Sequence, residues 1–237
     1  MEAVTLDLAT VSVALEETGL IVLGAFHPVP EDRVPPLAQG APAGTLVVIG
    51  NAGPAMWRVF SASPEARDGA PDPLDRWSAR VIGALAVRWR GVTLFPFGGP
   101  PYRPFVAWAK RAGPVAESPL GMLIHPDYGV WHAYRGAIAL AGRLALPAPD
   151  RRPRPCDRCA ERPCLAACPV GAFTGAAYDV GACVRHISAS AGAECVERGC
   201  RARLACPVGP AYRSTPAQAG FHMRAFLRAR REEAGET

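Results

Sequence analysis

Apolar residues in the first 147 positions gather in short stretches separated by Gly, Pro and polar residues. Stretches of this length, rich in Val, Ile, Leu and aromatic residues, are typical of strands. The predicted strands span residues 20–26, 45–50, 91–97, 121–125 and 133–140. The proline-rich residues 27–44 between the first two are predicted to form a loop or lid.

A second pattern, apolar residues three or four apart, predicts helices at 6–17, 55–61, 73–88 and 104–111. The third is the clearest, because Asp72 can cap it and Pro73 suits its first turn. Its apolar face comprises Leu74, Trp77, Val81 and Leu85. We expect this face to pack on the sheet.

Helices and strands alternate without the regular rhythm of a parallel sheet, which favours an α+β fold. Residues 147–155 contain four prolines and three arginines, a composition typical of a linker. We therefore predict a domain at 1–147, a linker at 148–155 and a domain with a C-terminal helix at 156–237.

Composition narrows the class of protein. The 237 residues are 49% hydrophobic, and no basic start with an unbroken apolar run suggests a signal peptide or membrane span. We expect a cytoplasmic protein that does not enter membranes. The formal charge of +5 is carried by residues 150–237, which hold 14 Lys and Arg against 9 Asp and Glu. A basic half often binds nucleic acid, but a metal cluster of negative charge would offset it, so nucleic acid is the less favoured partner.

All eight cysteines lie between Cys156 and Cys206, which argues for metal binding rather than a disulfide scaffold. They form two runs, each ending in Cys-Pro-Val-Gly. In two-cluster bacterial ferredoxins, three cysteines of a run bind one 4Fe-4S cluster and the fourth, before proline, binds the other. This crossing assigns the first cluster to Cys156, Cys159, Cys164 and Cys206. It assigns the second cluster to Cys168, Cys183, Cys195 and Cys200.

The spacing of the second run is looser, so the order of its ligands is less defined than the total of eight. Structural zinc also uses Cys-x2-Cys, but two zinc sites do not require the repeated Cys-Pro ending. Residues 150–215 resemble the two-cluster ferredoxin module of epoxyqueuosine reductase. That family joins its clusters to cobalamin, and the resemblance implies a small ferredoxin-like domain.

The segment 124–136, Ile-His-Pro-Asp-Tyr-Gly-Val-Trp-His-Ala-Tyr-Arg-Gly, carries a second resemblance. It is similar to the signature of the cobalamin-processing CblC family, and Asp72-Pro-Leu-Asp75 resembles that family's Asp-Pro-x-Asp. The resemblance implies a nitroreductase-like antiparallel sheet with flanking helices over residues 1–147, binding cobalamin with its lower base detached. The corrinoid-binding residues that it implies are His125, Tyr128, Gly129, Trp131, Arg135 and Gly136. Each has a structural alternative, such as a turn, a core aromatic residue or an ion pair of Arg135 with Asp127.

These features predict an iron-sulfur oxidoreductase that binds cobalamin base-off and passes electrons from two 4Fe-4S clusters to cobalt, reducing it or removing its upper ligand. One alternative is a corrinoid-dependent reductase of an organic substrate, for which Asp127 and Tyr128 are candidate general acids. Another is an electron carrier whose first domain only docks a partner. The electron donor, the upper ligand and the oligomeric state are not encoded in any motif.

Overall fold

The structure is a computed structural model that describes residues 6–233 and 235. It consists of two compact units, Met1–Pro114 with His132–Arg151, and Val115–Trp131 with Arg152–Thr237. The sequence predicted a boundary near the linker 148–155. The structure differs because 17 residues, Val115–Trp131, leave the first unit and fold with the cysteine-containing part. The outermost residues of both predicted domains, 1–5, 234 and 236–237, lie outside the described range.

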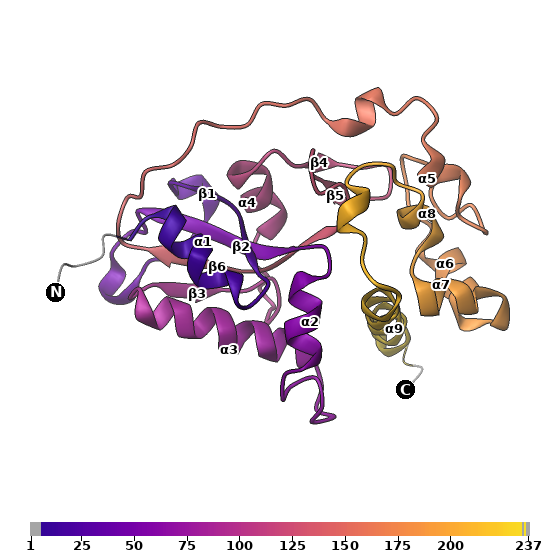
Figure 1. Cartoon of the computed structure of the whole chain (residues 1–237), viewed down its shortest axis with the longest axis horizontal. Coiled ribbons are helices and arrows are strands. Elements are labelled where there is room, and N and C mark those ends of the chain that lie inside the picture. The colour runs from indigo at the N-terminus through magenta and orange to yellow at the C-terminus, as the bar shows by residue number, and fades with distance from the viewer. Residues whose placement is uncertain (1–5, 234, 236–237) are drawn as a thin grey trace. The chain divides into compact units, whose positions relative to one another are not determined.

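A four-stranded antiparallel sheet forms the centre of the first unit (Figure 1). Its order is β1-β2-β6-β3, with bounds Ile21–Phe26, Thr45–Ala52, His132–Leu140 and Val92–Leu94. All neighbours pair antiparallel, which confirms the α+β prediction. The central strands β2 and β6 are buried over most of their length, as expected for their near-continuous Val, Ile, Leu and Ala.

Alternation along β2 directs its side chains to two apolar layers. Leu46 and Val48 pack with Phe105 and Trp108 of helix α4 (Phe105–Ala112). On the other face, Ile82 of helix α3 (Pro73–Arg88) lies against Gly136, the residue of β6 paired with Ile49 of β2. The two helices therefore cover opposite faces of the sheet (Figure 1).

Helix α3 begins and ends where the sequence predicted, but two details differ. Asp72 has a left-handed backbone with φ of 50° and makes no side-chain capping bond, so the predicted cap is wrong. The buried face is also rotated from the predicted one and comprises Leu74, Trp77, Ser78, Ile82 and Ala86. Ser78 is accommodated because its hydroxyl donates to the carbonyl of Leu74 at 2.7 Å. Helices α1 (Leu8–Glu16) and α2 (Ala55–Ser61) match their predictions within a few residues.

The second unit contains a two-stranded ribbon and several helices. Strands β4 (Ala116–Glu117) and β5 (Leu123–Ile124) pair antiparallel, so the strand predicted at 121–125 is shorter and separate from the main sheet. The helices are α5 (Pro163–Ala166), α6 (Val180–Ser188), α7 (Ala193–Arg198), α8 (Arg201–Leu204) and α9 (Pro216–Glu233). Helix α9 is the C-terminal helix that the sequence predicted and packs against α7.

The predicted linker contains neither helix nor strand until the short turn Pro155–Arg158. None of the described helices combines the length and the apolar character needed to cross a membrane.

Candidate metal centre

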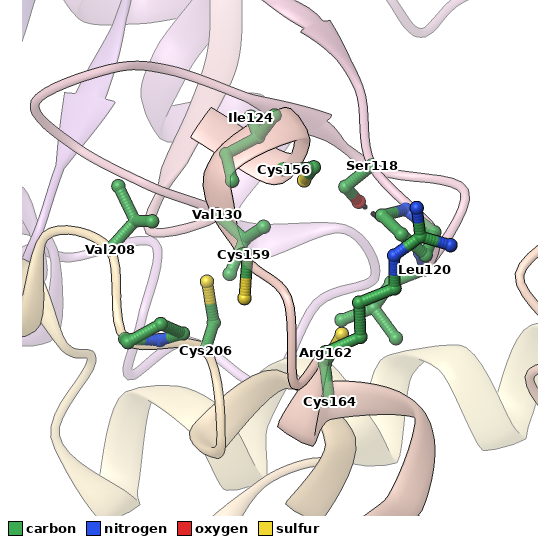
Figure 2. Close-up of a pocket in the computed structure, with 12 residues that line it drawn as sticks. Ser118, Leu120, Ile124, Val130, Cys156, Cys159, Arg162, Cys164, Cys206 and Val208 are labelled. Atoms are coloured by element: carbon green, nitrogen blue, oxygen red, sulfur yellow. Dashed lines mark hydrogen bonds between the residues drawn. The ribbon is translucent and has the colours of Figure 1, made fainter. Parts of the chain in front are cut away.

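Four cysteines from distant parts of the second unit line one cavity (Figure 2). They are Cys156, Cys159, Cys164 and Cys206. Cys156 lies within the turn Pro155–Arg158 and Cys159 directly follows it, Cys164 lies in α5, and Cys206 follows α8. These are the four residues that the crossed assignment placed in one group, although fifty positions separate the first from the last.

The rest of this cavity is built largely by the segment that precedes β6. Leu120, Ile124 and Val130 contribute apolar side chains, and Val208 contributes another from the loop after Cys206. Ile124, Val130 and Cys206 belong to one buried cluster. Sequence analysis missed this role, because nothing local relates residues 115–131 to cysteines that follow them by 25 residues or more.

The thiols of this group act on one another electrostatically. Burial raises the pKa of Cys164, and repulsion from Cys206, Cys156 and Cys159 raises it further. Burial also raises the pKa of Cys206, which the backbone N–H groups of Val208 and Val130 lower by hydrogen bonding and neighbouring thiolates raise. Thiolates held this close repel one another unless positive charge lies between them.

The other four cysteines form a second group, because their thiols also act on one another electrostatically. Burial raises the pKa of Cys183, and repulsion from Cys168 and Cys195 adds to it. Burial likewise raises the pKa of Cys200, with repulsion from Cys183 and Cys195. Cys168 therefore interacts with this group although it follows Cys164 by only four residues.

Donor groups surround the second set of thiols. The backbone N–H of Ala172 donates to the sulfur of Cys168 at 3.3 Å. The backbone N–H groups of Arg203 and Ala202 lower the pKa of Cys200, against the effect of burial. Burial raises the pKa of Tyr178 well above its ordinary value, and the nearby Cys183 raises it further. Such bonds stabilise thiolate charge, and sequence analysis had identified none of these donors.

Within the described part of the chain, no three His, Cys, Asp or Glu side chains are placed to hold a single metal ion together. Thiolates on one zinc ion lie about 3.8 Å apart, since each Zn–S bond is about 2.3 Å in a tetrahedron. A 4Fe-4S cube spreads its thiolates further, because each binds a different iron. The two metals therefore require different spacings of the same sulfur atoms.

The residues proposed to bind a corrinoid divide between the two units. His125, Tyr128, Gly129 and Trp131 lie in the second unit, whereas Arg135 and Gly136 lie in β6 of the first. His125 is buried, and its Nδ1 accepts hydrogen bonds from the backbone N–H groups of Asp127 and Tyr128 at 3.1 and 3.3 Å. Its ring stacks on Tyr128 at 4.3 Å between centroids. This histidine therefore organises a turn.

Gly129 and Trp131 pack against the loop after Cys206. The indole N–H of Trp131 donates to the carbonyl of Val208 at 3.0 Å, and this tryptophan is 2% exposed. Gly129 has φ of 57°, and a Cβ on it would lie 2.1 Å from the oxygen of Val208. Both residues therefore hold segment 115–131 to the cysteine-containing loop of the same unit.

Arg135 pairs with Asp75 at 2.7 Å, not with Asp127 as one alternative had it. The two segments that carry the CblC resemblance thus meet in one ion pair. Burial lowers the pKa of Arg135 and raises that of Asp75, and each charge opposes the shift of the other. Among the described residues, none provides a hydrogen-bond partner for the buried Nε of Arg135. Gly136 allows Ile82 to pack closely on strand β6, since a Cβ on Gly136 would lie 2.8 Å from the Cδ1 of Ile82.

The two candidate general acids also have partners. Asp127 forms a bidentate pair with Arg152, with both distances 2.6 Å. Tyr128 lies edge-on to Tyr212 at 4.9 Å, and burial raises its pKa. The Asp127 carboxylate is therefore occupied by Arg152, whereas the Tyr128 hydroxyl keeps its proton at neutral pH.

Comparison with known proteins leaves this geometry as the main guide to function. No protein-family model matches the chain, and no curated protein matches it.

Proposed function

We propose that the protein is an iron-sulfur oxidoreductase whose second unit holds two 4Fe-4S clusters in a ferredoxin-like arrangement. The observation that carries this proposal is the division of eight cysteines into two groups that cross between the two Cys-Pro runs. A crossed arrangement is the ligand pattern of two-cluster ferredoxins.

The chemistry of the donor set fits this group. Thiolates are the usual ligands of iron-sulfur clusters, and bound clusters supply one-electron transfer. The chain contributes an apolar wall formed by Leu120, Ile124 and Val130, which keeps water from the thiols. The backbone N–H of Ala172, which is directed at the sulfur of Cys168, would neutralise part of its charge.

The first prediction concerns metal content. Protein reconstituted under anaerobic conditions should contain about eight iron and eight sulfide per chain, as two cubes require. Iron and acid-labile sulfide analysis measures this directly. One or two equivalents of zinc with negligible sulfide would instead establish the structural-zinc alternative.

We further propose that the electron acceptor is cobalamin or another corrinoid, bound base-off. The support is the resemblance of segment 124–136 and of Asp72–Asp75 to the CblC family, together with the ion pair that joins Arg135 to Asp75. The predicted set of six does not form one ligand cradle within either unit, because His125, Gly129 and Trp131 are engaged in packing. Arg135 retains one buried donor with no partner among the described residues and is the residue of the set that best fits a ligand contact.

The second prediction tests this acceptor with Arg135→Met. If Arg135 contacts the corrinoid, the variant should bind cobalamin about tenfold more weakly, because one charge-assisted hydrogen bond is worth about 1.5–3 kcal/mol. Titration followed by the base-off absorbance spectrum gives the affinity. Arg88→Met, at an exposed arginine of the same α3–β6 unit, is the matched control and should bind like wild type.

The same titration separates the alternatives. A cobalamin spectrum that stays unchanged at saturating protein would remove the corrinoid and leave an electron carrier. If cobalamin binds base-off but turnover occurs only after an organic substrate is added, the corrinoid-dependent reductase is favoured.

A further inference from the structure

Arg203 lies midway between one cysteine of each group. It follows Cys200 by three residues and precedes Cys206 by three, on the single turn of α8. Its backbone carbonyl accepts from the N–H of Cys206 at 3.1 Å, and Arg203 lines one small pocket together with Cys200. Arg203 therefore lies close to one cysteine of each group.

The guanidinium of Arg203 is held in one place. Its Nε and Nη2 both donate to the carbonyl oxygen of Val130, at 3.1 and 2.6 Å. Its central carbon lies 5.2 Å from the ring centroid of Trp131. Val130 in turn lines the same cavity as Cys206 and belongs to the same buried cluster, so the arginine is anchored beside that cysteine.

The charge of Arg203 acts on thiols of both groups. Burial lowers its pKa, and the thiolates of Cys200 and Cys206 raise it. An arginine remains protonated in proteins, so this position carries a fixed positive charge. Glu194 of the neighbouring helix α7 pairs with Arg201 at 3.7 Å.

We propose that Arg203 is a positioning residue that raises the reduction potentials of both clusters, because its fixed charge lies beside one ligand of each. This inference rests on the proposed function. Adding one electron makes a cluster more negative, and a nearby positive charge stabilises that state. A single residue would then bring the two potentials up together, which favours electron transfer through the pair.

Potentiometric titration with dithionite, followed by electron paramagnetic resonance, tests the proposal on Arg203→Met, Arg203→Lys and Arg213→Met. Removing the charge in Arg203→Met should disfavour reduction of both clusters by about tenfold, or about 59 mV for a one-electron couple. Arg203→Lys keeps the charge and should shift both potentials less. Arg213 lies 5.9 Å from the same indole ring and is the matched control, with an expected change below about twofold.

Each outcome decides the matter. Wild-type protein without iron and sulfide would refute the proposed function itself. If wild type and Arg203→Met both hold two clusters and their potentials are the same, only the proposed role of Arg203 is refuted. A shift in the potential of one cluster alone would also refute it. If Arg203→Met loses its clusters, Arg203→Lys decides. If Arg203→Lys holds two clusters with near-wild-type potentials, the result supports the role of the positive charge. If Arg203→Lys also loses its clusters, Arg203 acts only by binding Val130.

Discussion

Replacing Cys206 with alanine should remove the cluster bound by Cys156, Cys159 and Cys164 and spare the other. Cys206 lines the same cavity as these three residues, and neighbouring thiolates of that group act on it (Figure 2). Iron should fall from about eight to about four per chain, since each cube holds four. Alanine is preferred to serine because a serine oxygen can remain a ligand.

The controls are Cys164→Ala and Cys168→Ala, whose positions differ by only four residues. If the crossed grouping is correct, Cys164→Ala should give the same residual cluster signal as Cys206→Ala. Cys168→Ala should lose the other signal, because its sulfur interacts with Cys183. Resonance Raman or electron paramagnetic resonance spectra of the three variants make the comparison. Identical spectra for Cys164→Ala and Cys168→Ala, with a different one for Cys206→Ala, would show that the groups follow the sequence runs instead.

The same variants separate cofactor binding from electron delivery. The first unit contributes none of the chain's eight cysteines, so Cys206→Ala should still bind cobalamin base-off if the proposed acceptor is correct. Reduction of the bound cobalamin by an external donor should slow if electrons pass through both clusters. Unchanged reduction with one cluster missing would show that the spared cluster alone delivers electrons.

The features that local pattern predicts well are those whose cause is local. The burial of β2 follows from its run of Val, Ile and Leu, and the length of α3 follows from its apolar spacing. The assignment of the cysteines to two groups drew on the repeated Cys-Pro ending, and such repetition is visible without structure. The cap at Asp72 was not, because a side chain can cap only from a backbone geometry that this left-handed residue does not adopt.

The features that sequence could not predict depend on contacts across long separations. Trp131 donates to Val208 across 77 residues, and Arg203 reaches Val130 across 73. These bonds hold segment 115–131 in the second unit, together with the predicted corrinoid residues His125, Tyr128, Gly129 and Trp131. The partner of Arg135 was missed for the same reason, since Asp75 lies 60 positions away and Asp127 only eight. No repeated motif links the partners of these contacts, so periodicity and spacing give no information about them.

Gly129→Ala should destabilise the second unit and release the first cluster faster. A non-glycine residue at φ of 57° costs about 1–2 kcal/mol for its left-handed backbone alone. The new Cβ would also lie 2.1 Å from the oxygen of Val208, a backbone atom that cannot rotate away. Relieving that clash costs about 1–3 kcal/mol more. It also displaces the neighbouring Val130, which lines the same cavity as Cys206 and packs in the same buried cluster.

Gly171→Ala is the matched control, because it isolates the backbone cost from the clash. Gly171 has φ of 59° in the same unit, and a Cβ there would meet nothing within 4 Å. The rate of iron release to a chelator under anaerobic conditions, measured with the temperature of unfolding, compares the two variants. We expect Gly129→Ala to release the first cluster at least about tenfold faster than Gly171→Ala, which corresponds to about 1.4 kcal/mol. Equal rates would mean that segment 115–131 does not press on the loop of Cys206. Val130 and the two hydrogen bonds that it accepts from Arg203 would then contribute little to holding the first group of thiols together.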